Sequence, residues 1–419
     1  MRTKIYTLLL LVTCANLSWA QSAKSVILLY LDGGPAQTET FDPKPTAGRN
    51  YAGAKLEESA IKTNVEGIEI GAGLPELAKI ADRYSLIRTM THGVNAHETG
   101  HYAMITGDLS KGSVVYPSYG SVISYMKRDS YKGVLPSYIS VVQANSRFNE
   151  GGFLGNSYKS FDTAGAPEKA TFEVAGIVNP QIDEQKLNSR MALLNKFETR
   201  DFESRKIDSL RQINMDFIWG DSREVFDLSS ESDSLRQRYG MTRIGQACLT
   251  ARRLVEAGVP FINVRTTGWD THKKHFQIMN QKLPELDNAL SALLLDLEQR
   301  GLLDSTIVLC GGEFGRDPKI LWEAPWNGGR AHFGRAFSYL IAGGGLAGGI
   351  VVGETDKQGE KIVSRPVYPA DLIATIYRHL GINPEGTLPH ISLGDLPILP
   401  SYGVEGQSNG IVDELLINK

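Results

Sequence analysis

The order of segments along the chain predicts an α/β protein with a mainly parallel central sheet. Short apolar runs, typical of buried strands, alternate with longer segments in which apolar residues repeat every three or four positions. This alternation is typical of βαβ units, in which helices cover both faces of a parallel sheet. In addition, an acidic residue closely follows three of the apolar runs, and ligands gather at the carboxyl ends of parallel strands.

The predicted strands are apolar runs rich in valine, isoleucine and leucine, which favour buried strands. Together they cover Val26–Leu31, Ser85–Thr89, Tyr138–Val142, Phe261–Val264, Thr306–Cys310, Ala336–Ala342 and Ile350–Gly353.

The predicted helices have apolar residues on one face, and a glycine follows each of them shortly after its end. They are His97–Ile105, Ile244–Val255, Leu286–Leu297 and Asp371–Leu380. Two of them lead directly into a predicted strand, which is the pattern of βαβ units with short connections.

The N-terminus is typical of a secretory signal peptide. Arg2 and Lys4 give it a positive start, Tyr6–Val12 is apolar, and Ser18-Trp19-Ala20 places small residues before the expected cleavage point. We therefore expect this segment to be removed and the protein to be periplasmic or secreted, without a transmembrane segment after cleavage. An uncleaved membrane anchor is the alternative.

After a signal peptide of residues 1–20, we expect residues 21–419 to form a single domain. Residues 181–235 are rich in charge and in helix formers, and they predict a charged helical insertion. The net charge of -3 argues against a nucleic-acid-binding protein, for which a basic excess is typical. Cys248 and Cys310 are interpreted as buried free thiols, although the sequence does not decide whether they pair.

Three carboxylates follow predicted strands. Asp32 comes after the first strand, Asp270 after Phe261–Val264, and Glu313 after Thr306–Cys310. If these strands are parallel, the carboxylates converge at one edge of the sheet and repel each other unless a cation lies between them. We therefore predict a hydrolytic metal site with these three residues among its ligands.

Histidines complete the predicted metal site. His272 comes two residues after Asp270, and in an extended segment this spacing places both side chains on the same side. His275 is an alternative to His272 in this role. His332 lies in a glycine-rich loop, which favours a metal ligand over a core histidine. Arg316, in the loop after the last of the three strands, is a candidate to bind an anionic substrate group.

The segment HETGHYAMITG predicts a helix that begins close to this site. His97 and His101 are four residues apart and share one helix face, and a helix N-terminus favours an anion such as phosphate or sulfate. Both histidines are candidate catalytic residues, and Thr99 offers a nearby hydroxyl for substrate binding. A packing role for the two histidines is the alternative.

The ordered set of motifs resembles the exported bacterial proteins catalogued as domain of unknown function 1501, a family related to sulfatases and to the alkaline phosphatase superfamily. The motifs that carry the resemblance span nearly the whole mature chain. They include LDGGPAQTETFDPKP, HETGHYAMITG, GGFLGNSY, GWDTH, DLEQRGLLDSTIVLCGGEFGR, GRAHFGRAFSYLIAGGG and RPVYPADLIATIYRHLGI.

The resemblance implies an alkaline-phosphatase/sulfatase-like three-layer sandwich that holds one or two divalent metals at the strand ends. By position in the motifs, Asp32 and Glu313 would bind one metal. Asp270, His272 and His332 would bind the other.

The resemblance also implies where a nucleophile would stand. The superfamily places a serine, threonine or modified cysteine ten residues before the glycine of a Thr-Gly pair, and His97 occupies that position here. His101 stands where sulfatases have an arginine, and Phe314 stands where a histidine would follow the acid. His97 would then be a metal ligand or a nucleophile that is phosphorylated, or His97 and His101 would act as acid or base while metal-activated water attacks.

These inferences favour an exported, metal-dependent hydrolase of phosphate or sulfate esters, acting on a small-molecule or glycan ester. One or two divalent ions are expected, and the mixed histidine and carboxylate donors fit zinc or manganese better than calcium. The alternative is a catalytically inactive relative that keeps the fold and binds an anionic glycan or a partner protein.

Overall fold

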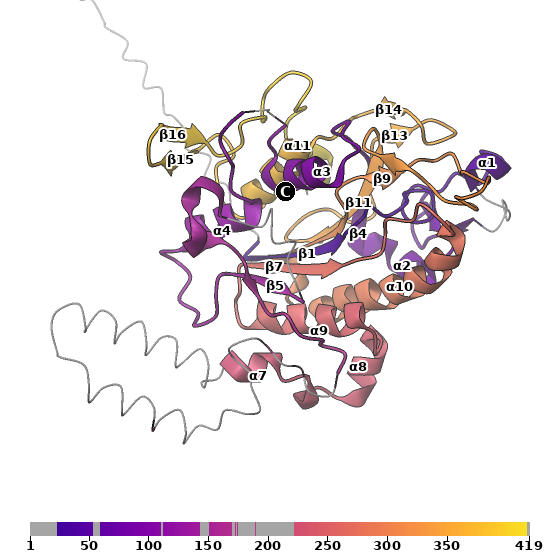
Figure 1. Cartoon of the computed structure of the whole chain (residues 1–419). Coiled ribbons are helices and arrows are strands. Elements are labelled where there is room, and N and C mark those ends of the chain that lie inside the picture. Colours follow the sequence, from indigo (N-terminus) through magenta and orange to yellow (C-terminus); the bar gives the residue numbers. More distant parts are fainter. Residues whose placement is uncertain are drawn as a thin grey trace, which may run out of the picture.

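A large sheet runs through the centre of the protein, between two layers of helices (Figure 1). The structure is a computed structural model that describes residues 23–52, 59–109, 112–142, 151–169, 172, 174, 189 and 222–416. Within this part of the chain the sheet has eight strands, in the order β12-β4-β11-β8-β1-β7-β5-β6. Their bounds in that order are Val351–Val352, Tyr84–Met90, Phe337–Gly343, Thr306–Gly311, Ser25–Leu31, Phe261–Thr266, Tyr138–Val141 and Phe161–Asp162.

The sheet is mainly parallel, as predicted. β1 lies between β8 and β7 and is parallel to both, and β5 continues this direction on the far side of β7. β11 differs, because it is antiparallel to both of its neighbours, β8 and β4. Each predicted strand is present, with ends within two residues of those expected.

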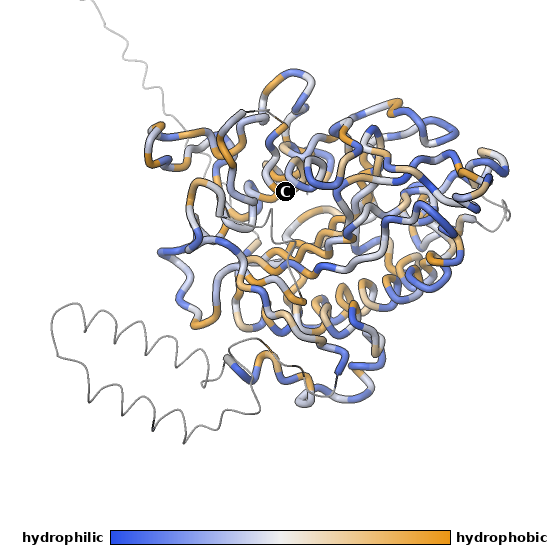
Figure 2. Tube along the Cα trace, viewed as in Figure 1, coloured by the Kyte–Doolittle hydropathy of each residue, from blue (hydrophilic) through white to orange (hydrophobic). Residues whose placement is uncertain are grey.

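Helices cover both faces of the sheet (Figure 1). On one face lie α2 (Pro75–Ala78), α8 (Asp233–Tyr239), α9 (Arg243–Glu256) and α10 (His275–Gln299), and on the other lie α3 (His97–Thr106), α4 (Tyr119–Lys127) and α11 (Pro369–His379). Figure 2 shows hydrophobic residues gathered in the central strands and along the helix sides that face them. The predicted α/β sandwich is therefore confirmed.

The side chains of β1 alternate between the two core layers. Ile27 and Leu29 pack on the side of α9 and α10, whereas Leu28 and Tyr30 pack on the side of α3 and α11. Successive strand residues point to opposite faces, and a strand covered on both faces is apolar throughout. This alternation turns the phenol of Tyr30 towards α3.

The four predicted helices are present, and their ends agree within two residues except at the start of α10, whereas α2 and α4 were not predicted. α3 ends at Gly107, which has a left-handed φ of 69°, a conformation that glycine adopts without steric cost. α10 begins at His275, well before the predicted start at Leu286.

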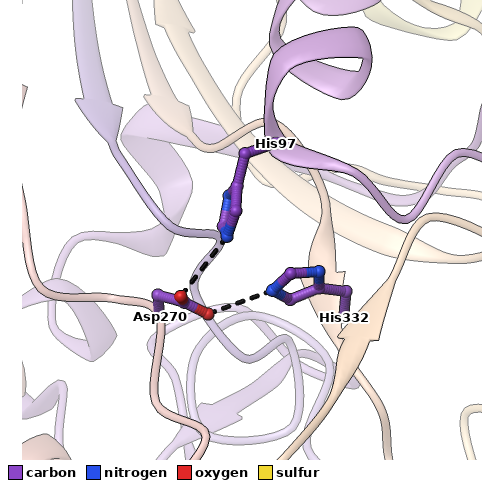
Figure 3. Close-up of side chains that lie close together, drawn as sticks. All are labelled: His97, Asp270 and His332. Carbon is purple, nitrogen blue, oxygen red and sulfur yellow. Dashed lines mark hydrogen bonds and ion pairs between the residues drawn. The ribbon is translucent and has the colours of Figure 1, made fainter.

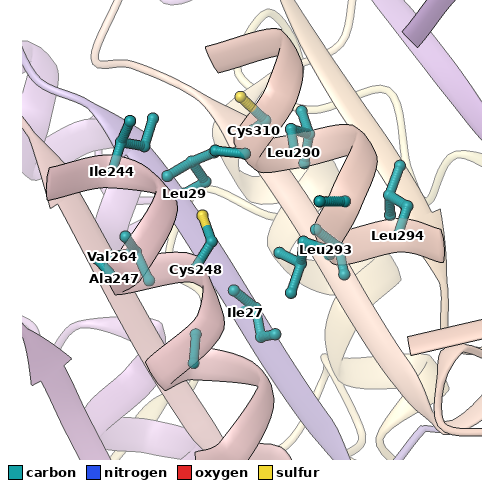
Figure 4. Packing of buried hydrophobic residues seen from close by; sticks show 14 of the residues in the cluster. Ile27, Leu29, Ile244, Ala247, Cys248, Val264, Leu290, Leu293, Leu294 and Cys310 are labelled. Atoms are coloured by element: carbon teal, nitrogen blue, oxygen red, sulfur yellow. The ribbon is translucent and has the colours of Figure 1, made fainter. Parts of the chain in front are cut away.

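The two cysteines lie in the core beneath the sheet (Figure 4). Cys248 of α9 and Cys310 of β8 are both buried free thiols, as predicted. Burial raises the pKa of the Cys248 thiol to about 12, and a protonated buried thiol is a poor nucleophile.

Two predicted features fall wholly or largely outside the described residues. The signal peptide of residues 1–20 lies outside them, as does most of the insertion predicted over residues 181–235. The described end of that segment forms α7 (Ser222–Phe226) and the start of α8. In the described part of the chain, no helix combines the length and the apolar character needed to cross a membrane.

Candidate metal centre

The site is built where three parallel strands end. Asp32 directly follows β1, while Asp270 and Glu313 lie in the loops after β7 and β8. Since these strands are adjacent and parallel, their carboxyl ends meet at one edge of the sheet. Two further elements reach this edge. His97 is the first residue of α3, and His332 lies in β10 (His332–Phe333), which pairs with β9 (Gly315–Arg316).

Three histidine side chains converge on the carboxylate of Asp270 (Figure 3 shows two of them). His97 Nε2 lies 3.3 Å from Asp270 Oδ2, and the Nε2 atoms of His272 and His332 lie 3.0 Å and 3.1 Å from Oδ1. His272 Nε2 and His332 Nε2 are 2.9 Å apart. The structure thus brings four of the predicted site residues together, and we name His97, Asp270, His272 and His332 the Asp270 cluster.

Two of these imidazoles are held through their other ring nitrogen. His97 Nδ1 lies 2.6 Å from Glu313 Oε1, and His332 Nδ1 lies 2.7 Å from the carbonyl oxygen of Asn95. A carbonyl or an ionised carboxylate accepts hydrogen bonds only, so each Nδ1 carries the hydrogen. Nε2 is then the ring nitrogen that faces Asp270, and a metal bound there would take the place of a proton on Nε2, which is the arrangement that supporting hydrogen-bond partners give to metal-binding histidines.

Glu313 lies behind His97, on the side away from Asp270. Its side chain is fully buried, and the carboxylate accepts hydrogen bonds from the backbone N–H of Gly33 at 3.0 Å and from the Tyr30 hydroxyl at 3.1 Å, besides the one from His97. Burial alone raises its pKa, but the hydrogen bond from His97 and nearby donors outweigh burial and hold the pKa below its usual value. The carboxylate is therefore ionised, and protein donors occupy it.

Asp32 is paired with a guanidinium. Arg265 Nη2 donates to Asp32 Oδ2, so a cation from β7 neutralises the first of the three predicted acids. Burial and the nearby charge of Glu313 raise the pKa of Asp32, and Arg265 opposes them. Sequence reasoning missed Arg265, although a charged residue near the end of the apolar run FINV was visible.

Arg316 is buried beneath the Asp270 cluster. Its Nε donates to the Gly34 carbonyl at 3.1 Å, its Nη1 donates to the Arg330 carbonyl at 3.3 Å, and its Nη2 donates to Gly33 and to Asp270 Oδ1. The guanidinium predicted to bind a substrate anion thus lies among protein acceptors. One of those acceptors is the central carboxylate itself.

His101 and Thr99 lie outside the cluster. His101 is buried one turn into α3, with Nδ1 2.6 Å from the Tyr30 hydroxyl, and burial lowers its pKa to about 4, which makes it neutral. Thr99 is exposed, and its hydroxyl lies 3.4 Å from the carbonyl of Ala96 in a weak contact. The predicted shared helix face is present, but it runs from the site into the core.

His275, the alternative to His272, does not approach Asp270. It is fully buried and lies against Glu39 instead. The aromatic ring of Phe314 stacks on His332 with ring centres 4.7 Å apart and lies 5.0 Å from His97. Phe314 therefore forms a wall that holds two imidazoles of the cluster in place.

The electrostatics favour a cation within the cluster. Burial raises the pKa of Asp270, but hydrogen bonds from His332 and His97 and the charge of Arg316 outweigh burial and hold the pKa well below its usual range. Hydrogen bonds to Asp270 and Glu313 raise the pKa of His97 to about 9, so at neutral pH a metal that binds His97 Nε2 displaces a proton. Burial lowers the pKa of His272. An ionised carboxylate faced by imidazole nitrogens is a donor set that suits a divalent transition metal.

The described residues fit one metal better than two. The ligand atoms of His97, Asp270 and His332 lie within 4.8 Å of one another. His272 is not part of that three-residue group, but its Nε2 lies 3.0 Å from Asp270 Oδ1 and 2.9 Å from His332 Nε2. The acids predicted for a second metal, Asp32 and Glu313, are bonded to Arg265 and to His97, Tyr30 and Gly33. A second ion at those acids needs the partners of Asp32 to move.

Several solved structures are similar to this chain. A protein in the alkaline phosphatase superfamily from Vibrio parahaemolyticus has a TM-score of 0.41 and 12% identity, and the match covers 87% of this chain and 68% of that one. The C-terminal periplasmic domain of EcEptC from Escherichia coli, in complex with Zn, has a TM-score of 0.41 and 10% identity, covering 91% and 94%. The lipoteichoic acid synthase LtaP from Listeria monocytogenes has a TM-score of 0.38 and 8% identity, covering 90% and 74%.

Comparisons by sequence give one result. No curated protein matches the chain. A family model described as "Protein of unknown function (DUF1501)" matches residues 23–393, which include every residue of the Asp270 cluster. The chain therefore belongs to the DUF1501 family.

Proposed function

We propose that the protein is an exported, metal-dependent hydrolase of phosphate or sulfate esters. One observation carries the proposal, which is the convergence of three imidazole Nε2 atoms on the Asp270 carboxylate. Two of these imidazoles are fixed through Nδ1 by Glu313 and by the Asn95 carbonyl, and such outer-shell fixing is typical of functional metal sites. The signal-peptide-like N-terminus supports export.

The cluster residues would bind one divalent ion, zinc or manganese rather than calcium, because imidazole nitrogens outnumber the oxygens. Bound there, such an ion supplies the positive charge that polarises an ester oxygen and promotes attack by water. The chain itself contributes orientation. Glu313 and Asn95 aim the histidines, and Arg316 keeps Asp270 ionised.

The geometry supports water as the nucleophile. His97 Nδ1 is bonded to Glu313, and Nε2 faces Asp270 as one of the proposed metal ligands, so neither ring nitrogen is left to attack an ester. The cysteines lie in the core, and Thr99 faces solvent. Asp32 directly follows β1 at the same edge of the sheet and is the candidate to accept a proton from water.

The arginine pairs favour a second candidate function. Arg316 and Arg265 neutralise Asp270 and Asp32 with protein cations, so part of the repulsion at the strand ends is relieved without a metal. A catalytically inactive relative that binds an anionic glycan or a partner protein agrees with these pairs. Metal content and turnover distinguish the two functions.

Removal of a cluster histidine is expected to abolish tight metal binding. We expect the purified mature protein to hold about one zinc or manganese ion per chain, and His332→Ala to lose it, because ligand loss leaves an incomplete tetrahedral set. Elemental analysis after gel filtration measures the stoichiometry. His390→Ala is the matched control and keeps the ion. Its ring lies in a surface hairpin, where it contacts Phe153 and accepts from the backbone N–H groups of Ser392 and Leu393. A wild type without metal after loading contradicts the proposal.

Glu313→Gln tests the outer shell. An amide accepts a weaker hydrogen bond from His97 Nδ1, so we expect metal affinity to fall by about 10–100-fold with all four ligands still present. Competition with a coloured chelator measures the dissociation constant. Tyr30→Phe removes a different hydrogen bond to the same carboxylate and should change the affinity much less. Equal affinity in Glu313→Gln and wild type contradicts the assigned role.

Hydrolysis is the direct test of activity. We expect the metal-loaded protein to cleave a nitrophenyl phosphate or sulfate ester, EDTA to stop the reaction, and added zinc or manganese to restore it. Asp270→Asn should lose more activity than the ~10–100-fold typical of an outer-shell change, while the exposed Thr99→Val keeps it. Turnover that continues in EDTA contradicts the metal mechanism. Tight metal binding without turnover of any ester favours the catalytically inactive relative.

A further inference from the structure

We propose that Glu39 is a positioning residue, which acts through His275 and Arg330 to fix the two loops that carry the candidate metal ligands. The inference rests on the proposed metal site. Glu39 belongs to the LDGGPAQTETFDPKP motif after β1, and the function described above leaves it without a role. Asp270 and His272 lie in one of the two loops, and His332 follows the other.

Glu39 joins two fully buried cationic or polar partners. Its Oε1 accepts from Arg330 Nη2 at 2.7 Å, and its Oε2 lies 2.7 Å from His275 Nε2. Both partner side chains are 0% exposed, and the Glu39 side chain is 13% exposed. Burial raises the pKa of Glu39, but Arg330 and His275 outweigh burial and lower the pKa to about 2. The carboxylate is ionised at neutral pH and can only accept hydrogen bonds.

His275 links the Glu39 carboxylate to the first loop. Because Glu39 accepts only, His275 Nε2 carries the hydrogen. Burial lowers the pKa of His275, so the ring is neutral and its Nδ1 accepts a hydrogen bond from the Thr271 hydroxyl at 2.6 Å. Thr271 is itself buried and lies between Asp270 and His272 in the chain. The Glu39 carboxylate thereby fixes the residue that separates two members of the cluster.

Arg330 links the Glu39 carboxylate to the second loop. The Arg330 backbone N–H donates to the Thr271 carbonyl at 3.1 Å, and its guanidinium also donates to the carbonyls of Tyr51 at 2.7 Å and Asp317 at 3.0 Å. A Cβ at Gly329 would lie 1.8 Å from the His272 carbonyl oxygen, so the two loops touch through their backbones. His332 follows two residues after Arg330.

The candidate ligands lie in loops, and the contacts of Glu39, His275 and Arg330 support those loops. A metal site needs its ligands within about 0.5 Å of the productive geometry, which requires supporting contacts. Burying three ionisable groups costs free energy that hydrophobic packing would avoid. Glu39, His275 and Arg330 contact Thr271 and the loop before His332. Support of the candidate site explains why these ionisable groups are buried at this place.

The chain offers a matched control for the experiment. Glu231 also has a nearly buried carboxylate, 11% exposed, that pairs with two cations, Arg252 at 2.7 Å and Arg253. These partners lie near the C-terminal end of α9, which leads into the start of β7, whereas the loop with Asp270 and His272 follows the other end of β7. Glu39→Gln and Glu231→Gln therefore remove the same charge from similar surroundings, but only the first lies against the candidate site.

Zinc titration of the two variants by calorimetry tests the inference. We expect Glu39→Gln to raise the dissociation constant for zinc by about 10–100-fold, and Glu231→Gln to leave it unchanged, although both lower the melting temperature. Thr271→Val removes the hydroxyl alone and keeps the volume, so it should weaken zinc binding with little loss of stability. Wild-type affinity in both Glu39→Gln and Thr271→Val would overturn the inference.

Hydrogen exchange separates failure of this inference from failure of the proposed function. A wild type that binds no zinc contradicts the metal site, but the positioning role still predicts faster amide exchange over 270–275 and 328–332 in Glu39→Gln than in Glu231→Gln. Equal exchange in the two variants at those segments overturns the positioning role, whatever the wild type binds.

Discussion

Repulsion among carboxylates at one edge of a parallel sheet is the constraint on which the site depends. Asp32, Asp270 and Glu313 are brought together because their strands run side by side in the same direction. Each is neutralised in a different way. Arg265 pairs with Asp32, His97 and backbone donors surround Glu313, and Asp270 meets Arg316 and three imidazoles. Of the three, only Asp270 meets more than one imidazole, and that difference singles it out as the centre of the site.

The site is therefore organised in shells rather than as a set of equivalent acids. Three imidazoles face Asp270, and the Nδ1 atoms of two of them, His97 and His332, are bonded to Glu313 and to the Asn95 carbonyl. Behind the loops, Glu39 ties His275 and Arg330 together. Each layer limits the freedom of the one inside it, which is how a protein presents ligands in a fixed geometry to an ion.

Sequence patterns predicted the parts of the fold that depend on local order. Apolar runs located the strands, and the acids after them converge as expected. The spacing of Asp270 and His272 correctly placed both on one side, whereas His275 turns away because α10 begins there. Spacing on a helix face could not show that His101 points into the core one turn beyond His97. Arg265 and Glu39 were missed because their partners are far away in the chain, 233 residues for Arg265 and Asp32, and the antiparallel direction of β11 leaves no mark in its composition.

Anomalous diffraction from a zinc-soaked crystal, collected on both sides of the zinc edge, tests the central claim most directly. The account predicts one strong peak among His97 Nε2, Asp270, His272 Nε2 and His332 Nε2, with Glu313 still bonded to His97 Nδ1 and Asp32 still paired with Arg265. A peak between Asp32 and Glu313 would contradict this account. So would a crystal in which zinc fully occupies other sites but gives no peak at the Asp270 cluster.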